Sequence, residues 1–356
     1  MTIYLATVVA TILLQLLRAT VGTTDGGPRR TSAVQWGIDC VCILVLAAAP
    51  GFRAWHVGTD TIMYVSMYDT TIDTASWSNT TEQSIVEPGF ALWQFIWSLL
   101  GLSTRWFLVV TALVTNGLQY GAIRMIAPRM LPAISAYSLS GFYLFQFNGM
   151  RQALAISIFV FGMALILRGR RRGWVLLVLA ALVHQSTLIA LPAFILAHRY
   201  RRRTTFNTRI VLLSGGVFLA LVLISTALAT FLTDLVGDKY GAYLGQDMGS
   251  GRGRLVHLAL MLMVVWFLQS TRLPDELHCA SRFYSLGLGA QVVGLQLAVL
   301  DRVTLYFAAC LPMLIAPLLA HGSRARHAVL WLGIVTYFFI SLTRYGDLLP
   351  YEWSPS

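Results

Sequence analysis

Charge is scarce in this sequence. Only 12% of the 356 residues are charged and 15 are acidic, whereas a soluble domain carries about 25% charged residues. Apolar residues make up 57% of the chain and the mean hydropathy is +0.68. The composition therefore excludes an ordinary soluble domain and predicts a polytopic membrane protein.

Lysine and cysteine are also rare. A single Lys accompanies 25 Arg, and a net charge of +11 in a membrane protein usually sets its orientation rather than binding nucleic acid. The four cysteines lie in or beside apolar runs, without the spacing of a metal site. Cys40 and Cys42 are too close together for a zinc knuckle and are typical of helix packing. We therefore expect no metal, no other cofactor and no nucleic-acid partner.

Apolar runs long enough, or nearly so, to cross a membrane recur along the chain. They cover residues 3–17, 33–50, 104–126, 131–147, 150–168, 208–231, 255–270, 283–300, 303–320 and 328–343. The first run has no positive region and no small-residue cleavage site, so we expect it to be retained as a span. The prediction is an all-α polytopic membrane protein with about 10 spanning helices. These would form a single transmembrane domain, residues 1–356, with outer loops at 51–87 and 232–254.

An aromatic-rich segment at residues 88–102 does not fit this pattern. It begins with Pro88, a residue favoured in the first turn of a helix. We predict a juxtamembrane helix (88–102) lying at the membrane interface, with a full span as the alternative.

A second exception is residues 168–203, an apolar run with an Arg cluster at each end. A break at His184 and Gln185 gives a re-entrant helical hairpin (174–197), which keeps both clusters cytoplasmic and places His184 at the outward tip. With the N-terminus outside, this hairpin leaves 18 Arg in the cytoplasm and 7 outside, whereas a straight span gives 13 and 12. The positive-inside rule therefore favours the hairpin. Its tip must be buried in protein or line a wet cavity.

The Arg residues left outside need a reason other than orientation, and anion binding is the natural candidate. They are Arg53, Arg105, Arg151, Arg252, Arg254, Arg302 and Arg344.

The first outer loop concentrates acidic residues. Residues 53–87 hold five of the 15 acidic residues, namely Asp60, Asp69, Asp73, Glu82 and Glu87. Such a loop beside a membrane favours chemistry on a hydroxyl or a phosphate, and an acidic solvated loop is an equal alternative. Asp60 follows a small, flexible Gly-Thr pair that would let its carboxylate turn toward the membrane surface.

Asn148, Arg151 and Gln152 form an unusually polar turn between two apolar runs. The guanidinium group of Arg151 can bind two phosphate oxygens at once. The alternative is an Arg that extends to the lipid headgroups.

Other polar groups also lie at the outer face. His184 can donate to a phosphate or shuttle a proton, or simply cap two half-helices. Asp301 and Arg302 form either an intramembrane ion pair or part of an anion site. The Gly-rich loop at 237–254 lacks phosphate-loop spacing, so we expect a lid or a substrate groove.

Several enzyme classes lack support. The sequence has no GxSG serine-protease motif and no HExxH metalloprotease motif. It also has no cytoplasmic nucleotide-binding loop and no transporter-type internal repeat.

Six weak motifs occur in an order that resembles the EpsG family of exopolysaccharide and capsule polymerases, which are Wzy-like. They are Gly58-Thr59-Asp60 with Tyr64 and Tyr68, Glu87-Pro88-Gly89-Phe90, Asn148-Gly149-x-Arg151-Gln152, Ala181-x-x-His184-x-Ser186, Asp301-Arg302 with Tyr306, and Leu349-Pro350-Tyr351. The resemblance runs from about residue 33 to 351.

This resemblance implies a bacterial plasma (inner) membrane protein that joins undecaprenyl-diphosphate-linked oligosaccharide repeats at the outer face. Its partners would be the lipid-linked oligosaccharide, membrane lipid, and a flippase and chain-length regulator. An acidic outer loop followed by a juxtamembrane helix also resembles the GT-C glycosyltransferase layout, which is an analogy of fold alone.

For such a transfer, a leaving diphosphate must be held and an acceptor hydroxyl deprotonated. We expect Arg151 first, then Arg53, His184 and Arg302, to bind the diphosphate. Asp60 is the predicted general base and Glu87 the second candidate, with Tyr64, Asn148 and Gln152 as further site residues. Transfer is expected to be metal-independent, although Asp60 with Glu87 is an alternative pair for a divalent ion.

Two other functions compete with this one. A lipid-linked oligosaccharide flippase would use the same outer Arg residues, but it would also need a polar path through the spans. An acyltransferase using His184 would need a partnering motif that the sequence does not supply.

Overall fold

The computed structural model describes residues 1–21, 32–74, 77, 86–200, 251–295, 298–344 and 346–354. These residues are mostly helical and contain no strand, only an isolated bridge between Arg53 and Trp353. The predicted span at 208–231, most of the outer loop 232–254 and Glu82 lie outside the described residues.

Five described helices are long and apolar enough to cross a membrane. They are α1 (Thr2–Val21), α2 (Ala33–Gly51), α6 (Thr104–Ile126), α9 (Met150–Leu167) and α18 (Arg324–Arg344). A sixth candidate is a pair bent by 51°, made of Asp301–Ala308 in α16 (Ala298–Ala308) and α17 (Leu311–Ala320). The remaining helices are α3 (Thr61–Thr74), α5 (Pro88–Leu99), α7 (Met130–Ser138), α8 (Gly141–Phe145), α10 (Gly173–Val183), α11 (Thr187–Arg199), α14 (Gly251–Gln269) and α15 (Asp275–Gly294).

The described chain thus has five or six candidate spans where the apolar runs predicted about ten over the whole sequence. Two runs read as single spans are broken. The run at 131–147 is split into α7 and α8, because the Ser140 side chain accepts a hydrogen bond from the Tyr143 N–H and starts a new helix. The run at 303–320 bends where Pro312 opens α17. Hydropathy records how apolar a run is, and these interruptions leave it almost unchanged.

The hairpin predicted from the Arg clusters is present. Helix α10 ends at Val183, α11 begins at Thr187, and the rings of Trp174 and His198 meet 5.9 Å apart. Because Trp174 lies near the start of α10 and His198 near the end of α11, the two arms must run antiparallel, with their turn between Val183 and Thr187.

Helix α9 is the centre of the bundle, with 78% of its residues buried. It packs against α6 on one side and α10 on the other. Gly162 of α9 faces Gly173 of α10, and a Cβ on Gly162 would lie 2.9 Å from the Gly173 carbonyl oxygen. The absence of side chains here lets the hairpin approach α9 closely, so the position of the hairpin tip is set by backbone packing.

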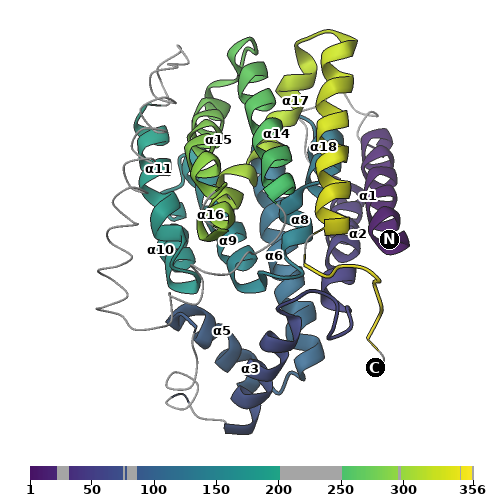
Figure 1. The fold of residues 1–356 in the computed structure, drawn as a ribbon, viewed down its shortest axis with the longest axis vertical. Coiled ribbons are helices and arrows are strands. Elements are labelled where there is room, and N and C mark those ends of the chain that lie inside the picture. Colours follow the sequence, from purple (N-terminus) through teal and green to yellow (C-terminus); the bar gives the residue numbers. More distant parts are fainter. Residues whose placement is uncertain are drawn as a thin grey trace.

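The acidic stretch at residues 51–87 was predicted to be a loop, but part of it is helical. Helix α3 occupies much of it, because Thr61, Tyr64 and Tyr68 recur at helical spacing and bury one face. The Tyr68 ring stacks on Phe107 of α6 at 4.0 Å. Helix α5 follows, opened by Pro88 as predicted, and α3 and α5 lie together at one end of the bundle (Figure 1).

A buried cluster of charged residues joins α1, α2 and α6 near the start of α2. Asp39 of α2, whose side chain is 2% exposed, is 2.7 Å from Arg18 of α1 and 3.5 Å from Arg124 of α6. Tyr120 donates to the same carboxylate. Asp39 lies inside an apolar run and was not singled out from the sequence. Two guanidinium groups on one buried carboxylate join three helices, since a buried charge needs such partners.

The hairpin makes a prediction about sidedness. In a background without the four native cysteines, Arg171→Cys and Arg199→Cys should both be labelled by an impermeant maleimide only from the cytoplasmic side. Both positions are exposed and lie near the ends where the hairpin arms come together. Labelling of position 199 from outside would show that α10 and α11 cross the membrane as one span.

Candidate functional site

The C-terminal segment, residues 346–354, holds the start of the first outer loop in place. The Ala54 N–H donates to the Glu352 carbonyl at 2.9 Å, and the Gly58 N–H donates to the Asp347 carbonyl at 3.1 Å. The Tyr4 hydroxyl of α1 donates to the Leu348 carbonyl at 2.9 Å, which attaches the segment to α1. The loop before α3 therefore has a defined path.

Asn148 organises the turn that carries Asp60. Its Oδ1 accepts hydrogen bonds from the Thr59 N–H at 2.7 Å and from the Thr59 hydroxyl at 3.3 Å. The same hydroxyl lies 3.0 Å from Asp60 Oδ1, to which it can donate. Gly58 has φ +89° and Gly346 has φ +71°, values that favour glycine. The structure thus brings together two residues predicted separately, Asp60 and Asn148, and Asp60 forms no ion pair with another described residue.

Arg53 is placed differently from the other predicted anion ligands. Its side chain is 1% exposed, donates to the Thr61 hydroxyl at 2.8 Å and to the Pro50 carbonyl, and lies over the Phe147 ring. Burial lowers the pKa of Arg53 to about 10. These contacts hold the end of α2 to the start of α3 and favour an anchoring role.

Glu87 joins three elements at the hairpin tip. One carboxylate oxygen lies 2.9 Å from Nη1 of Arg151, at the start of α9. The other accepts a hydrogen bond from the Gln185 N–H at 3.0 Å and lies 3.7 Å from His184 Nδ1. The side chains of Glu87 and Arg151 are 15% and 22% exposed, so the pair is largely shielded from water. Carboxylate and guanidinium groups that the sequence placed in separate roles therefore form an ion pair.

His184 is fixed in one orientation by the turn itself. Its Nδ1 accepts a hydrogen bond from the Ser186 N–H at 3.2 Å, so in the neutral ring the proton lies on Nε2. Burial, reinforced by the charges of Arg151 and Arg302, lowers the pKa of His184 despite the nearby Glu87. A neutral imidazole with an Nε2–H donor is the form that the site holds.

His184, Ser186 and Glu87 lie together but do not form a nucleophilic triad. The Ser186 hydroxyl is 2.9 Å from Nδ1, and the Glu87 carboxylate approaches that same nitrogen. A triad needs the serine on one ring nitrogen and the carboxylate on the other. The geometry therefore gives no support to an acyltransferase that uses His184.

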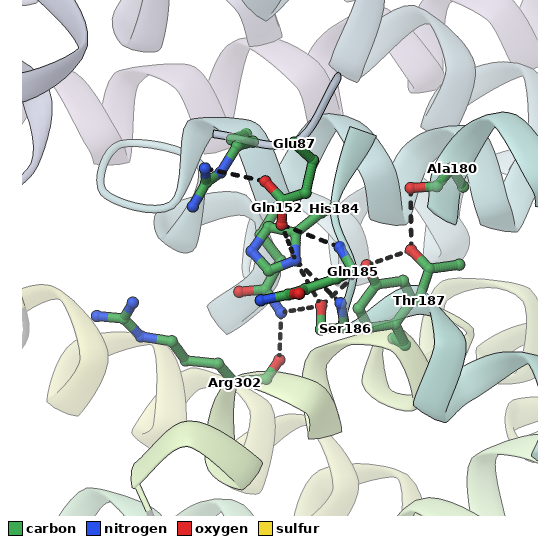
Figure 2. A network of polar contacts seen from close by, with 10 residues as sticks. Glu87, Gln152, Ala180, His184, Gln185, Ser186, Thr187 and Arg302 are labelled. Atoms are coloured by element: carbon green, nitrogen blue, oxygen red, sulfur yellow. Dashed lines mark hydrogen bonds and ion pairs between the residues drawn. The ribbon is translucent and has the colours of Figure 1, made fainter. Parts of the chain in front are cut away.

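A hydrogen-bond network continues from the tip to α16 (Figure 2). Gln152 of α9 donates to the Ser186 hydroxyl at 3.3 Å and to the Arg302 carbonyl at 3.0 Å. Tyr306 receives a hydrogen bond from Ser186 at 3.2 Å and bonds the Thr187 hydroxyl at 2.7 Å. Figure 2 shows the Arg302 side chain extending away from this network, while its backbone remains part of it. Gln152 is thus a positioning group for the hairpin and for Arg302.

Tyr64 connects the two halves of the site. It is buried in α3 in one apolar cluster with Met150 of α9 and Val183 of α10, and its N–H donates to the Asp60 carbonyl at 3.2 Å. Burial raises the pKa of Tyr64 to about 12, with Arg151 opposing the shift. The phenol therefore stays protonated at neutral pH and can serve as a hydrogen-bond donor.

A cavity of about 320 Å³ opens beside this network. Its polar and charged lining residues are Thr59, Asn148, Arg254, His257, Asp301, Arg302, Tyr337, Ser341 and Arg344. Three guanidinium groups thus face one carboxylate, Asp301, which lies 3.8 Å from Arg254. Arg302 and Arg344 form no ion pair with another described residue, so the described lining of the cavity carries a surplus of positive charge.

The predicted site residues therefore divide by location. Asn148 and Arg302 line the cavity, and Asp60 adjoins it through Thr59. Glu87, Arg151, Gln152, His184 and Tyr64 surround the hairpin tip. The cavity residues Arg254 and Arg344 were not chosen from the sequence, although both belong to the outside Arg set. Asp69 and Asp73 are exposed on α3, as the solvated reading of that stretch expected.

Together these features define a class: a polytopic helical membrane protein with a cationic cavity and an acidic turn at one end of its bundle. Comparison with protein families matches residues 38–353 to the EpsG family, and the chain therefore belongs to that family. The resemblance drawn from six short motifs is thereby confirmed. No curated protein and no solved structure matches the chain.

The Asn148 turn gives a testable packing requirement. A Cβ on Gly346 would overlap Nδ2 of Asn148, and its φ of +71° is unfavourable for alanine. We expect Gly346→Ala to lower the thermal stability and to displace the turn at Gly58, with a cost of about 1–3 kcal/mol. Heating curves of the purified protein in detergent would measure this.

Gly101→Ala is the matched control. Its φ of +72° imposes the same backbone strain, but nothing lies within 4 Å of the added Cβ. If both substitutions lower the melting temperature equally, the Asn148 contact does not limit position 346.

Proposed function

We propose that this protein is a polysaccharide polymerase that joins undecaprenyl-diphosphate-linked oligosaccharide repeats at the outer face of the bacterial plasma membrane. Membership of the EpsG family supports the polymerase activity. The observation that carries the mechanism is the cavity that three guanidinium groups line, with the Asp60 turn at its edge.

In this proposal the cavity holds the diphosphate of the donor. Among the described lining residues, three Arg and one Asp leave two positive charges, which equal the two negative charges of a diphosphate diester. Arg302 and Arg344 would bind the phosphate oxygens directly, because neither has a carboxylate partner in the described chain. Arg254, which is paired with Asp301, would contribute positive charge without binding the phosphate directly.

The transfer forms one bond and breaks another. The acceptor hydroxyl oxygen attacks the anomeric carbon of the donor sugar, and the bond from that carbon to the diphosphate oxygen breaks. The electron pair leaves with the diphosphate, whose growing charge the Arg side chains stabilise. Asp60 takes the proton of the hydroxyl as general base, with its carboxylate oriented by Thr59. The residues of this chain thus supply both the anion site and the base, without a step that requires a cofactor.

Helices α3 and α5, set apart at one end of the bundle, support a GT-C-type layout as part of the proposal (Figure 1). The membrane lipid would deliver the substrates, and a flippase and a chain-length regulator would act before and after the polymerase. A flippase function for this chain is the competing proposal. A ladder of products from purified protein and a defined lipid-linked repeat alone would support the polymerase, whereas substrate movement across vesicles without a ladder would overturn it.

Asp60→Asn tests the base. The amide keeps the size of the side chain and can still bond Thr59, so folding should persist, while turnover should fall about 10²–10⁴-fold. Asp73→Asn is the matched control on the exposed part of α3 and should be close to neutral. Full-length polymer from well-folded Asp60→Asn protein would move the base to another residue, with Glu87 next.

Arg302→Lys tests the anion site. Lysine keeps the charge but loses the planar fork that holds two phosphate oxygens. We expect the catalytic efficiency toward the donor to fall about tenfold or more, the range for a charge-assisted hydrogen bond. Arg324→Lys, an exposed position at the start of α18, serves as control. Equal activity of both variants would remove Arg302 from the diphosphate site.

A further inference from the structure

The site has a second half, and its chemistry differs from that of the cavity. None of Glu87, Arg151 and His184 lines the cavity. The charge of Arg151 is balanced by Glu87 at 2.9 Å, and His184 is held as a neutral ring. The cavity has a surplus of positive charge, whereas the hairpin tip has none.

A phosphate on Arg151 would face a physical obstacle. The Glu87 carboxylate already occupies that guanidinium, so an arriving phosphate would lie beside a like charge. If Glu87 moved away, a mostly shielded carboxylate would lose its cationic partner, which is costly. Glu87 also accepts a hydrogen bond from the Gln185 N–H at 3.0 Å, so moving it would leave this backbone donor in the turn without its acceptor. The arrangement disfavours an anion at this place.

A sugar faces no such obstacle. Its hydroxyl groups both donate and accept, so they can bond a carboxylate and a guanidinium side by side without adding charge. The pair is 15% and 22% exposed, and the neutral His184 ring, 18% exposed, offers a further Nε2–H donor. Arg151 follows Asn148 by three residues, and Asn148 Oδ1 accepts a hydrogen bond at 2.7 Å from the N–H of Thr59, the neighbour of Asp60, where the acceptor proton would leave.

We propose that the Glu87–Arg151 pair and His184 form the acceptor-sugar subsite, which binds the hydroxyl groups of the incoming repeat, and that the diphosphate is bound only in the cavity. This assignment rests on the proposed polymerase function. It moves Arg151, the first diphosphate ligand expected from the sequence, to carbohydrate recognition. The two halves of the site then bind groups of different charge, since the donor diphosphate enters the cationic cavity and the uncharged acceptor hydroxyl groups meet the neutral hairpin tip.

Two probes separate the halves. Inorganic pyrophosphate reports on the cavity through its binding affinity, measured by calorimetry on the purified protein. A soluble glycoside of the repeat unit, which lacks a diphosphate leaving group, can act only as acceptor, so its KM reports on the hairpin tip.

The test variant is the double substitution Glu87→Gln with Arg151→Gln, which leaves no unpaired charge and should fold. We expect the KM for the glycoside acceptor to rise about tenfold or more. Pyrophosphate affinity should stay within about threefold, because no group in the cavity changes. Arg302→Gln should show the reverse pattern, and the exposed Arg170→Gln should change neither quantity.

The outcomes distinguish the two proposals. If Arg302→Gln does not weaken pyrophosphate binding, the cavity is not the diphosphate site and the proposed mechanism fails. If Arg302→Gln does weaken it and the double variant weakens it equally, Arg151 is a phosphate ligand and the acceptor subsite is overturned. An unchanged acceptor KM in the double variant would also overturn it. Glu87→Gln alone provides a check on folding, since its amide oxygen can still accept from the Gln185 N–H.

Discussion

The site depends on how a helix end is satisfied where little water is available. The tip of the α10–α11 hairpin exposes backbone N–H groups that need acceptors. Glu87 supplies one acceptor for Gln185, and the His184 ring supplies another for Ser186. Both acceptors come from groups that also carry charge or a titratable proton. The need to close the turn therefore brings a carboxylate, an imidazole and the Arg151 guanidinium to one place, and the chemistry of the site follows from that closure.

Much of the fold could be predicted because short stretches of sequence determine it. Arg clusters on both sides of one apolar run required a reversal, and the structure reverses at His184. Pro88 correctly predicted the start of α5. The number of spans could not be predicted in the same way, because the Ser140 side chain, which accepts a hydrogen bond from the Tyr143 N–H, starts a new helix within an unbroken apolar run. The helical character of α3 was missed because, apart from Val65, its buried face consists of Tyr and Thr, which hydropathy counts as nearly neutral.

The sequence predicted which residues belong to the candidate site better than it predicted which of them contact one another. Asp60, Asn148, Arg151, His184 and Arg302 could be selected because polar groups are conspicuous between apolar runs. Which of them pair depends on helix packing, so the contact between Glu87 and Arg151 could not be foreseen from positions so far apart in the sequence. Arg53 illustrates the converse. It belongs to the same outside Arg set, yet it is buried and donates both to the Pro50 carbonyl at the end of α2 and to the Thr61 hydroxyl at the start of α3.

The segment 346–354 has a consequence for how the protein is made. Its backbone supplies the acceptors that hold Ala54 and Gly58, and it leans on Tyr4 of the first helix. These residues leave the ribosome long after the turn that they support. The Asp60 turn therefore reaches its final shape only when α18 has been inserted and the chain has folded back beside α1. A partly synthesised chain would already carry Arg254 and Arg302 of the cavity and would still lack the backbone acceptors that shape the Asp60 turn.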